Sequence, residues 1–265
     1  MFLDALIAIF FFLVGLEIKN GIKDFKTAVV PIVAALGGMI VPASIYLFLN
    51  PGSHVWAASM PTDIALALGV LSLLGKRVNP HVRLFLLTLA IADDLFSLIV
   101  LAIFYGDDLE PIKALTTLVA ATIGFLLPLR THALHKVIKV LTPLSTYFIV
   151  PVIVIVNIPL DINISAFTSQ TTIAIIIARS IGKIIGITLF AWLALRFGGH
   201  ANIGIKEITG IATLAGMGLT VALVIADIAA RSEVELDQVR LGLFVSAIIS
   251  GLAGYIWLRR TPAQL

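Results

Sequence analysis

The sequence predicts an all-α polytopic membrane protein with a single transmembrane domain over residues 1–265, and three observations lead to that fold class. Hydrophobic residues make up 60% of the chain and charged residues only 12%, whereas soluble domains carry about 25% charged residues. The mean hydropathy is +1.10. The apolar residues gather into stretches near the ~20 residues that a helix needs to cross a bilayer. This composition argues against a soluble enzyme, a disordered protein and a nucleic-acid-binding protein.

Nine apolar stretches follow one another along the chain, and each is predicted to form a transmembrane helix. They run near Phe2–Ile18, Thr27–Leu49, Val55–Leu74, Val82–Tyr105, Leu115–Leu129, Val137–Val156, Thr171–Leu195, Ile208–Ala230 and Leu241–Leu258. The fifth is short and rich in threonine, which favours a half-helix or a tilted helix. The absence of cysteine excludes disulfides and thiolate metal sites.

The first stretch has two interpretations, a transmembrane helix or a signal peptide. A signal peptide needs a basic leader and a cleavage site flanked by small residues. Here Asp4 is acidic, and no such cleavage site follows. We therefore expect a helix that remains in the protein.

The distribution of basic residues predicts the orientation of the chain. The loops after the first, third, fifth and seventh stretches, together with the C-terminus, hold 13 of the 18 lysines and arginines, and the opposite loops hold Lys113, Arg231 and Arg240. Because cytoplasmic loops are enriched in Lys and Arg, we expect the N-terminus outside, the C-terminus in the cytoplasm and the protein in the cell membrane (the inner membrane of a Gram-negative cell).

A carboxylate and a proline interrupt the third stretch, where the sequence reads Pro61-Thr62-Asp63. Proline removes a backbone donor and disturbs the preceding turn, and irregular backbone at membrane depth is tolerated where it lines a cavity. A simple proline kink would explain Pro61 but not a costly carboxylate beside it. We therefore expect a functional helix break here.

Two adjacent aspartates, Asp93 and Asp94, lie in the middle of the fourth stretch. Neighbouring residues on a helix point about 100° apart, so the two carboxylates are expected to face different partners. Carboxylate and carbonyl oxygens suit a hard cation. A solvated pair at a helix end is disfavoured, because apolar residues flank the aspartates on both sides.

Two basic residues, Arg179 and Lys183, lie within the seventh stretch. Lys183 is too far from the start of the stretch for snorkelling to be the better interpretation, so it is expected to pair with a carboxylate. Arg179 is one turn earlier. We expect Arg179 to pair with Asp227 of the eighth stretch, since an unpaired buried charge is expensive; a hydrated Asp227 near the outer surface is the alternative.

The eighth stretch contains Gly216 and Gly218 within Ala215-Gly216-Met217-Gly218. These glycines indicate either a second helix break or close helix packing, and the glycine content of the stretch does not distinguish the two.

Several segments, taken in order, resemble the NhaA family of bacterial sodium/proton antiporters. They are Phe10–Lys19, Ala35–Ala43, Pro61–Leu71, Leu89–Leu95, Gly124–Leu129, Ile181–Lys183 and Gly216–Thr220. The resemblance implies an inverted-repeat helix bundle, in which the third and eighth stretches are broken and cross near the ion site. It covers nearly the whole chain.

The resemblance also implies roles for individual residues. Asp94 would bind sodium and protons alternately, and Asp93 would pair with Lys183. Asp63, with Thr62 beside it, would offset the dipole ends of the crossed half-helices, and Glu17 would line the cytoplasmic funnel. No catalytic residue and no cofactor are expected; Na+, Li+ as an alternative ion, and H+ are the transported species.

The chain departs from the family pattern by its length. Helices corresponding to the family's first, sixth and seventh have no counterpart, which leaves nine. The family's dimerising hairpin is also without counterpart, which argues against a homodimer.

The resulting interpretation is a sodium/proton antiporter that extrudes Na+ in exchange for external H+ and contributes to pH and sodium homeostasis. A degenerate homologue that inserts but does not transport is the main alternative, because three helices are missing. An intramembrane aspartate-dependent enzyme ranks last, since a protease dyad needs two carboxylates about 3 Å apart, whereas neighbouring helical residues point apart.

Overall fold

The computed structural model describes residues 2–21, 25–75, 78–105, 119–128, 131–157 and 164–261 of the chain, and every regular element in these ranges is helical. The elements are α1 (Phe2–Gly21), α2 (Phe25–Leu49), η1 (His54–Ser59), α3 (Ile64–Leu73), α4 (Pro80–Phe104), α6 (Ala120–Leu126), α7 (Thr131–Leu144), η4 (Ser145–Ile149), α8 (Val150–Val156), α9 (Ile164–Phe167), α10 (Gln170–Ile177), η5 (Ala178–Gly182), α11 (Lys183–Arg196), α12 (Ile205–Ala215), α13 (Thr220–Ala229) and α14 (Glu233–Arg260). The predicted all-α fold class is confirmed.

Six helical stretches in the described ranges are long and apolar enough to cross a membrane. They are Ala28–Leu49, His54–Leu73, Pro80–Phe104, Ala133–Val156, Gln170–Arg196 and Glu233–Arg260. A seventh candidate is the pair α12 and α13, which bends by 47° at its break. α1 contains a shorter apolar helix, and only α6 of the fifth predicted stretch is described. The total of nine helices therefore stays a prediction.

Side-chain caps explain where several helices begin. Asn79 accepts a hydrogen bond from the N–H of His81, and Pro80 occupies the first turn of α4, where its missing N–H costs nothing. Ser232 caps α14 by accepting from the N–H of Glu235. α14 therefore begins well before the predicted Leu241, because its first two turns are polar and the apolar pattern starts only later.

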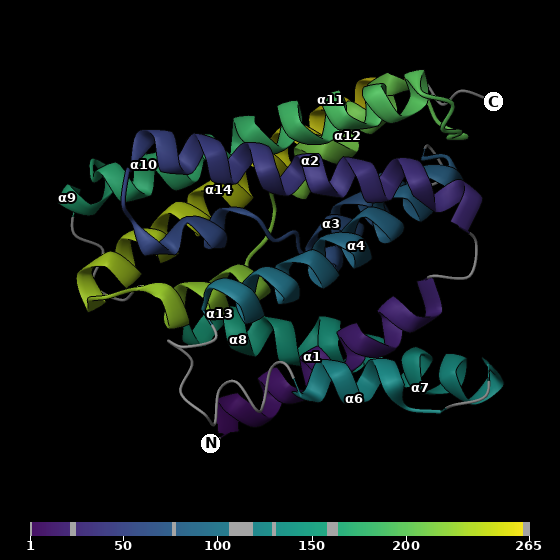
Figure 1. Ribbon diagram of the computed structural model, residues 1–265, viewed down its shortest axis with the longest axis horizontal. Coiled ribbons are helices and arrows are strands. Elements are labelled where there is room, and N and C mark those ends of the chain that lie inside the picture. The colour runs from purple at the N-terminus through teal and green to yellow at the C-terminus, as the bar shows by residue number, and fades with distance from the viewer. Residues whose placement is uncertain are drawn as a thin grey trace.

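The helices form two groups that lie side by side in Figure 1. One group contains α2, α10, α11, α12 and α14, and the other contains α1, α6, α7 and α8. α3 and α4 lie between them, and α4 contacts both α1 and α2.

Glycines allow the closest approach between helices in the first group. A Cβ at Gly37 of α2 would lie 2.3 Å from the carbonyl oxygen of Gly186 in α11, and a Cβ at Gly186 would lie 2.1 Å from that of Gly37. Small residues at such crossings let two backbones touch, which is a common source of association between helices in lipid. This contact fixes α11, the helix that begins at Lys183, against α2.

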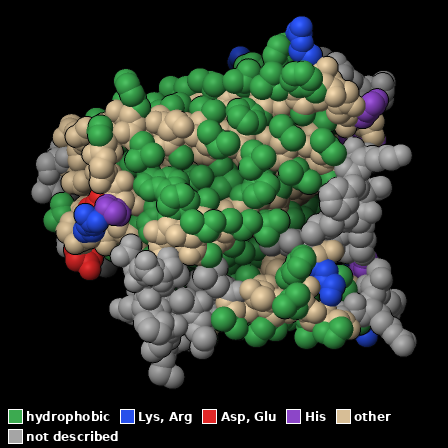
Figure 2. Space-filling model, in the orientation of Figure 1, with side chains coloured by type: hydrophobic (Ala, Val, Ile, Leu, Met, Phe, Trp, Pro, Cys, Tyr) green, Lys and Arg blue, Asp and Glu red, His purple; other side chains and the backbone are tan. Residues whose placement is uncertain are grey.

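Hydrophobic side chains cover most of the face shown in Figure 2, and the coloured charges lie towards its edges. Large apolar side chains such as Phe48, Leu73 and Tyr147 are exposed. A soluble protein rarely exposes an apolar surface of this extent, whereas lipid tails would cover it. The surface therefore agrees with a multi-pass membrane protein.

Two π-helical turns interrupt the long helices. η4 separates α7 from α8, and η5 separates α10 from α11. Such turns often occur at functional sites, because they rotate the residues that follow relative to a regular helix. η5 contains Arg179 and ends immediately before Lys183.

Candidate functional site

The third predicted stretch is broken at Pro61, as the sequence indicates. η1 ends at Ser59, the next four residues are not helical, and α3 begins at Ile64. Asp63 is the N-cap of α3, and its Oδ1 accepts hydrogen bonds from the N–H groups of Ala65 (3.1 Å) and Leu66 (3.3 Å). The carboxylate thus satisfies donors that every helix leaves open at its first turn.

The eighth stretch is also broken, and both interpretations of its glycines apply. α12 ends at Ala215 and α13 begins at Thr220. A Cβ at Gly218 would lie 2.1 Å from the carbonyl oxygen of Pro61. Gly218 is therefore required at the point where the two breaks meet, and the break and the close packing occur together.

Direct hydrogen bonds join the two broken helices at their crossing. The N–H of Asp63 donates to the carbonyl of Met217 (3.0 Å), and the hydroxyl of Thr62 donates to the carbonyl of Ala215 (3.1 Å). The second oxygen of Asp63, Oδ2, accepts from the N–H of Thr220 (3.4 Å) and from the hydroxyl of the same residue. One carboxylate therefore lies at the amide ends of both α3 and α13, where a negative charge is stabilised by the helix dipoles.

Asp93 and Lys183 form an ion pair beside this crossing. Lys183 Nζ lies 3.2 Å from Asp93 Oδ2 and also donates to the hydroxyl oxygen of Thr62 at 2.6 Å. The Lys183 and Asp93 side chains are 0% and 1% exposed. A buried ion is tolerated only with such compensation, so the structure supplies the carboxylate partner expected for Lys183.

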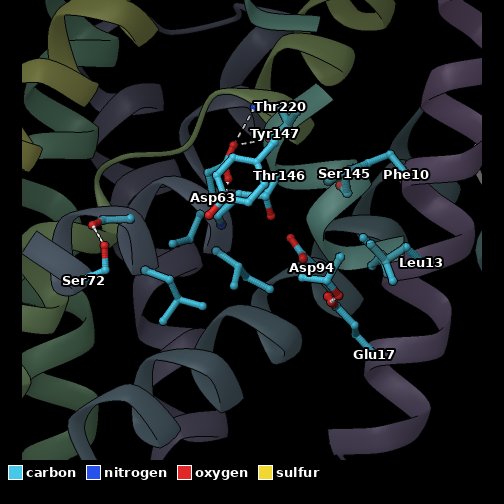
Figure 3. A pocket seen from close by; sticks show the side chains of 17 residues that line it. Phe10, Leu13, Glu17, Asp63, Ser72, Asp94, Ser145, Thr146, Tyr147 and Thr220 are labelled. Carbon is cyan, nitrogen blue, oxygen red and sulfur yellow. Dashed lines mark hydrogen bonds between the residues drawn. The ribbon is translucent and has the colours of Figure 1, made fainter. Parts of the chain in front are cut away.

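Asp94 faces a different environment from its neighbour. It is 4% exposed, and its Oδ1 has no hydrogen-bond partner among the described residues. It lines a cavity of about 340 Å³ to which Asp63, Thr62 and Thr220 also contribute. Figure 3 shows Asp94 between Asp63 on one side and Glu17 on the other. An acceptor without a partner, next to a cavity, can take up a proton or a cation.

Glu17 lies on the same cavity, in α1. It is half-buried and accepts a hydrogen bond from Thr142 Oγ1 at 3.2 Å. Ser145 and Thr146 of η4 add hydroxyl groups to the wall. The structure thus brings Glu17 to the cavity of Asp94, and it adds hydroxyl residues that sequence reasoning missed, because a lone Ser or Thr in an apolar helix carries little signal.

Three aspartates approach the site without forming a chelating cluster. Asp63 is bonded to backbone amides and Asp93 Oδ2 to Lys183, whereas Asp94 lines the cavity, and its Oδ1 has no hydrogen-bond partner among the described residues. No group of three His, Cys, Asp or Glu side chains in the described ranges is arranged to hold a metal ion together. A cation at this place would be bound by Asp94 with neutral oxygens.

The expected pairing of Arg179 with Asp227 is wrong. Arg179 is 0% exposed and donates to the carbonyls of Ala58, Pro61 and Gly216, whereas Asp227 is exposed near the end of α13. The error has a physical cause. The sequence shows which residue is charged, but it does not show that a helix break in another span offers carbonyl oxygens as partners.

Comparison with known proteins identifies relatives along almost the whole chain. The family model described as Na+/H+ antiporter 1 matches residues 1–130 and 114–258. The protein from Salmonella arizonae described as Na(+)/H(+) antiporter NhaA is 34% identical over 317 residues, covering 97% of this chain and 82% of its own. Proteins of the same description from Shigella dysenteriae and Shewanella baltica are 35% and 32% identical, with the same coverage.

The lengths of these alignments bear on the architecture. The alignment with the Salmonella arizonae protein runs over 317 residues, although this chain has only 265. The family match also divides into two parts near residues 114–130. Both findings agree with a chain shortened internally, after α4. The coverage, the identity and the family match together establish that the chain belongs to the NhaA family of Na+/H+ antiporters.

Proposed function

We propose that this chain exchanges Na+ for protons across the membrane, and that Asp94 is the group for which the two ions compete. The observation that carries the proposal is the contrast among the three buried aspartates. Asp63 is bonded to the amide ends of α3 and α13, and Asp93 is paired with Lys183 through Oδ2, whereas Asp94 lines the cavity without a cationic partner among the described residues.

Exchange follows from this arrangement without a further energy source. Asp94 holds either a proton or a cation, so loading one ion requires release of the other. Thr62 and Thr220 supply hydroxyl oxygens on the cavity wall, and oxygen ligands suit a hard cation such as Na+ or Li+. Rocking of the crossed broken helices would expose Asp94 to each side of the membrane in turn.

The physiological direction is Na+ outward against H+ inward, which would serve sodium and pH homeostasis. In the proposed orientation the N-terminus lies outside and the C-terminus in the cytoplasm, in the cell membrane, which in a Gram-negative cell would be the inner membrane. The distribution of basic residues over the loops supports this orientation.

The test is sodium-driven collapse of a pH gradient in everted membrane vesicles that contain the full chain. Asp94→Asn keeps the size of the side chain but can neither titrate nor neutralise a cation, so we expect it to abolish exchange. Asp237→Asn, the same change at an aspartate of α14 whose side chain is 42% exposed, is the matched control and should exchange normally.

Two outcomes would contradict the proposal. Exchange by Asp94→Asn at the wild-type rate would remove Asp94 from the site. A wild-type chain that reaches the membrane and moves protons with neither Na+ nor Li+ would be a non-transporting homologue.

A further inference from the structure

Arg179 is a buried cation for which the exchange mechanism has no use. Its guanidinium donates from Nη1 to the carbonyl of Ala58 (2.8 Å) and from Nη2 to the carbonyl of Pro61 (2.8 Å). Nε and Nη2 both donate to the carbonyl of Gly216, at 3.4 Å and 3.3 Å. One side chain therefore bonds to both broken helices at once.

The three carbonyls share a position in the fold. Ala58 and Pro61 lie at and just beyond the end of η1, and Gly216 follows the end of α12. Helix ends of this kind leave carbonyl oxygens without partners, and the dipoles make them negative. The positive guanidinium lies at these carbonyl ends, just as the Asp63 carboxylate lies at the amide ends of α3 and α13.

Lys183 does not share this task, although it lies only four residues later. Within the described part of the chain, its hydrogen bonds go to Thr62 Oγ1 and Asp93 Oδ2 and to no carbonyl. The π-helical turn η5 contains Arg179 and ends immediately before Lys183. Arg179 bonds to the backbone of the crossing, whereas Lys183 bonds to the side chains of Thr62 and Asp93. The planar fork of arginine suits several acceptors in fixed positions, which a lysine ammonium does not match.

We propose that Arg179 is a positioning residue of the ion site. It fixes the carbonyl ends of the two broken helices to each other, and thereby sets where Thr62 and Asp63 lie relative to Asp94. Pro61, which accepts from Nη2, is followed directly by Thr62 and Asp63, so any shift at the guanidinium is passed on within two residues.

The space around the guanidinium supports this assignment. A Cβ at Gly218 would lie 2.2 Å from Arg179 Nη2 and 2.1 Å from the carbonyl oxygen of Pro61. The crossing is thus packed against Arg179 with no room for even a methyl group. A fully buried charge with only carbonyl partners is costly to keep. What Arg179 contributes in return is a fixed geometry at the crossing.

The experiment measures amide hydrogen exchange of the purified full chain, which does not depend on transport. The variants are Arg179→Lys, which keeps the charge and loses the fork, and Arg179→Gln. Arg196→Lys, at an exposed arginine of α11, is the matched control. We expect faster exchange at residues 60–66 and 216–220 in both Arg179 variants, unchanged exchange within α14, and wild-type behaviour for the control.

A second measurement connects the crossing to the ion, and it rests on the proposed function. Binding of Na+ should raise the melting temperature, and the Na+ concentration at half of this rise should be about tenfold higher in the Arg179 variants. The reason is that misplacement by about 1 Å can cost ~10²-fold at a preorganised site. Gly218→Ala crowds the guanidinium without removing it and should behave in the same way.

Each outcome decides the proposal. It is overturned if amide hydrogen exchange at the crossing is unchanged, or if it rises equally throughout the chain. It is also overturned if the melting temperature of folded variants depends on Na+ as in the wild type. Failure of all three variants to fold, with Arg196→Lys intact, would make Arg179 a purely stabilising residue and overturn it as well. A wild-type chain that neither binds nor exchanges Na+ would defeat the proposed function, and hydrogen exchange would still decide the role of Arg179 at the crossing.

Discussion

Removing one member of the Asp93–Lys183 pair should destabilise the protein strongly, while removing both should not. At 3.2 Å and an effective dielectric constant near 20, the two charges attract each other by about 5 kcal/mol. Their burial offsets much of this gain, so the intact pair adds little net stability. A single substitution leaves one buried charge uncompensated, at a cost of about 3–5 kcal/mol.

The assay is thermal unfolding of the purified chain in detergent. Asp93→Asn and Lys183→Met should each lower the melting temperature by roughly 6–20 °C, taking ~2–4 °C per kcal/mol for a chain of this size. The double variant should recover a large part of the loss. Asp237→Asn is the matched control, because Asp237 pairs with Arg240 at a similar 3.3 Å but is 42% exposed, and exposed pairs contribute about 0–1 kcal/mol.

Two results would refute this reasoning. A double variant no more stable than the worse single variant would show that the two charges are not energetically coupled. Equal losses for Asp93→Asn and Asp237→Asn would show that burial does not govern the cost.

Three further predictions follow from the fold. Asp63→Asn should lower both Na+/H+ exchange in vesicles and the melting temperature, because the neutral Asn side chain cannot neutralise the positive N-terminal ends of α3 and α13; wild-type values would contradict this role. Gly186→Ala should lower the melting temperature, since its Cβ would lie 2.1 Å from the Gly37 carbonyl and overpacking costs about 1–3 kcal/mol; Gly199→Ala, which meets a carbonyl at 2.7 Å, should cost less. A reporter fused to the C-terminus should read as cytoplasmic, and an external reading would overturn the proposed orientation.

Much of the fold could be predicted because the bilayer imposes strong constraints on the sequence. Apolar length gives the helices, and Pro61 marks a break, because proline removes a backbone donor wherever it occurs. The glycines at 216 and 218 were ambiguous, since glycine serves both breaks and close contacts, and the structure shows that it serves both here.

The site could be predicted only in part, because its residues come from separate helices. The charge of Arg179 was evident, but its partners are carbonyls of η1 and α12, and a carbonyl carries no sequence signal. The π-helical turns η4 and η5 likewise have no residue pattern of their own, so the sequence could not show how η5 separates the directions of Arg179 and Lys183.

The crossing of the two broken helices also has a consequence for how the protein is made. Asp63 and Thr220, which meet at the crossing, are 157 residues apart in the chain. At about 5–20 residues per second of synthesis, α3 waits roughly 8–30 s in the membrane before α13 exists. During that interval the carboxylate of Asp63 lacks the partners it has in the finished protein. The ion site is therefore completed only after α13 has been synthesised, and until then the break at Asp63 lacks half of its hydrogen-bond partners.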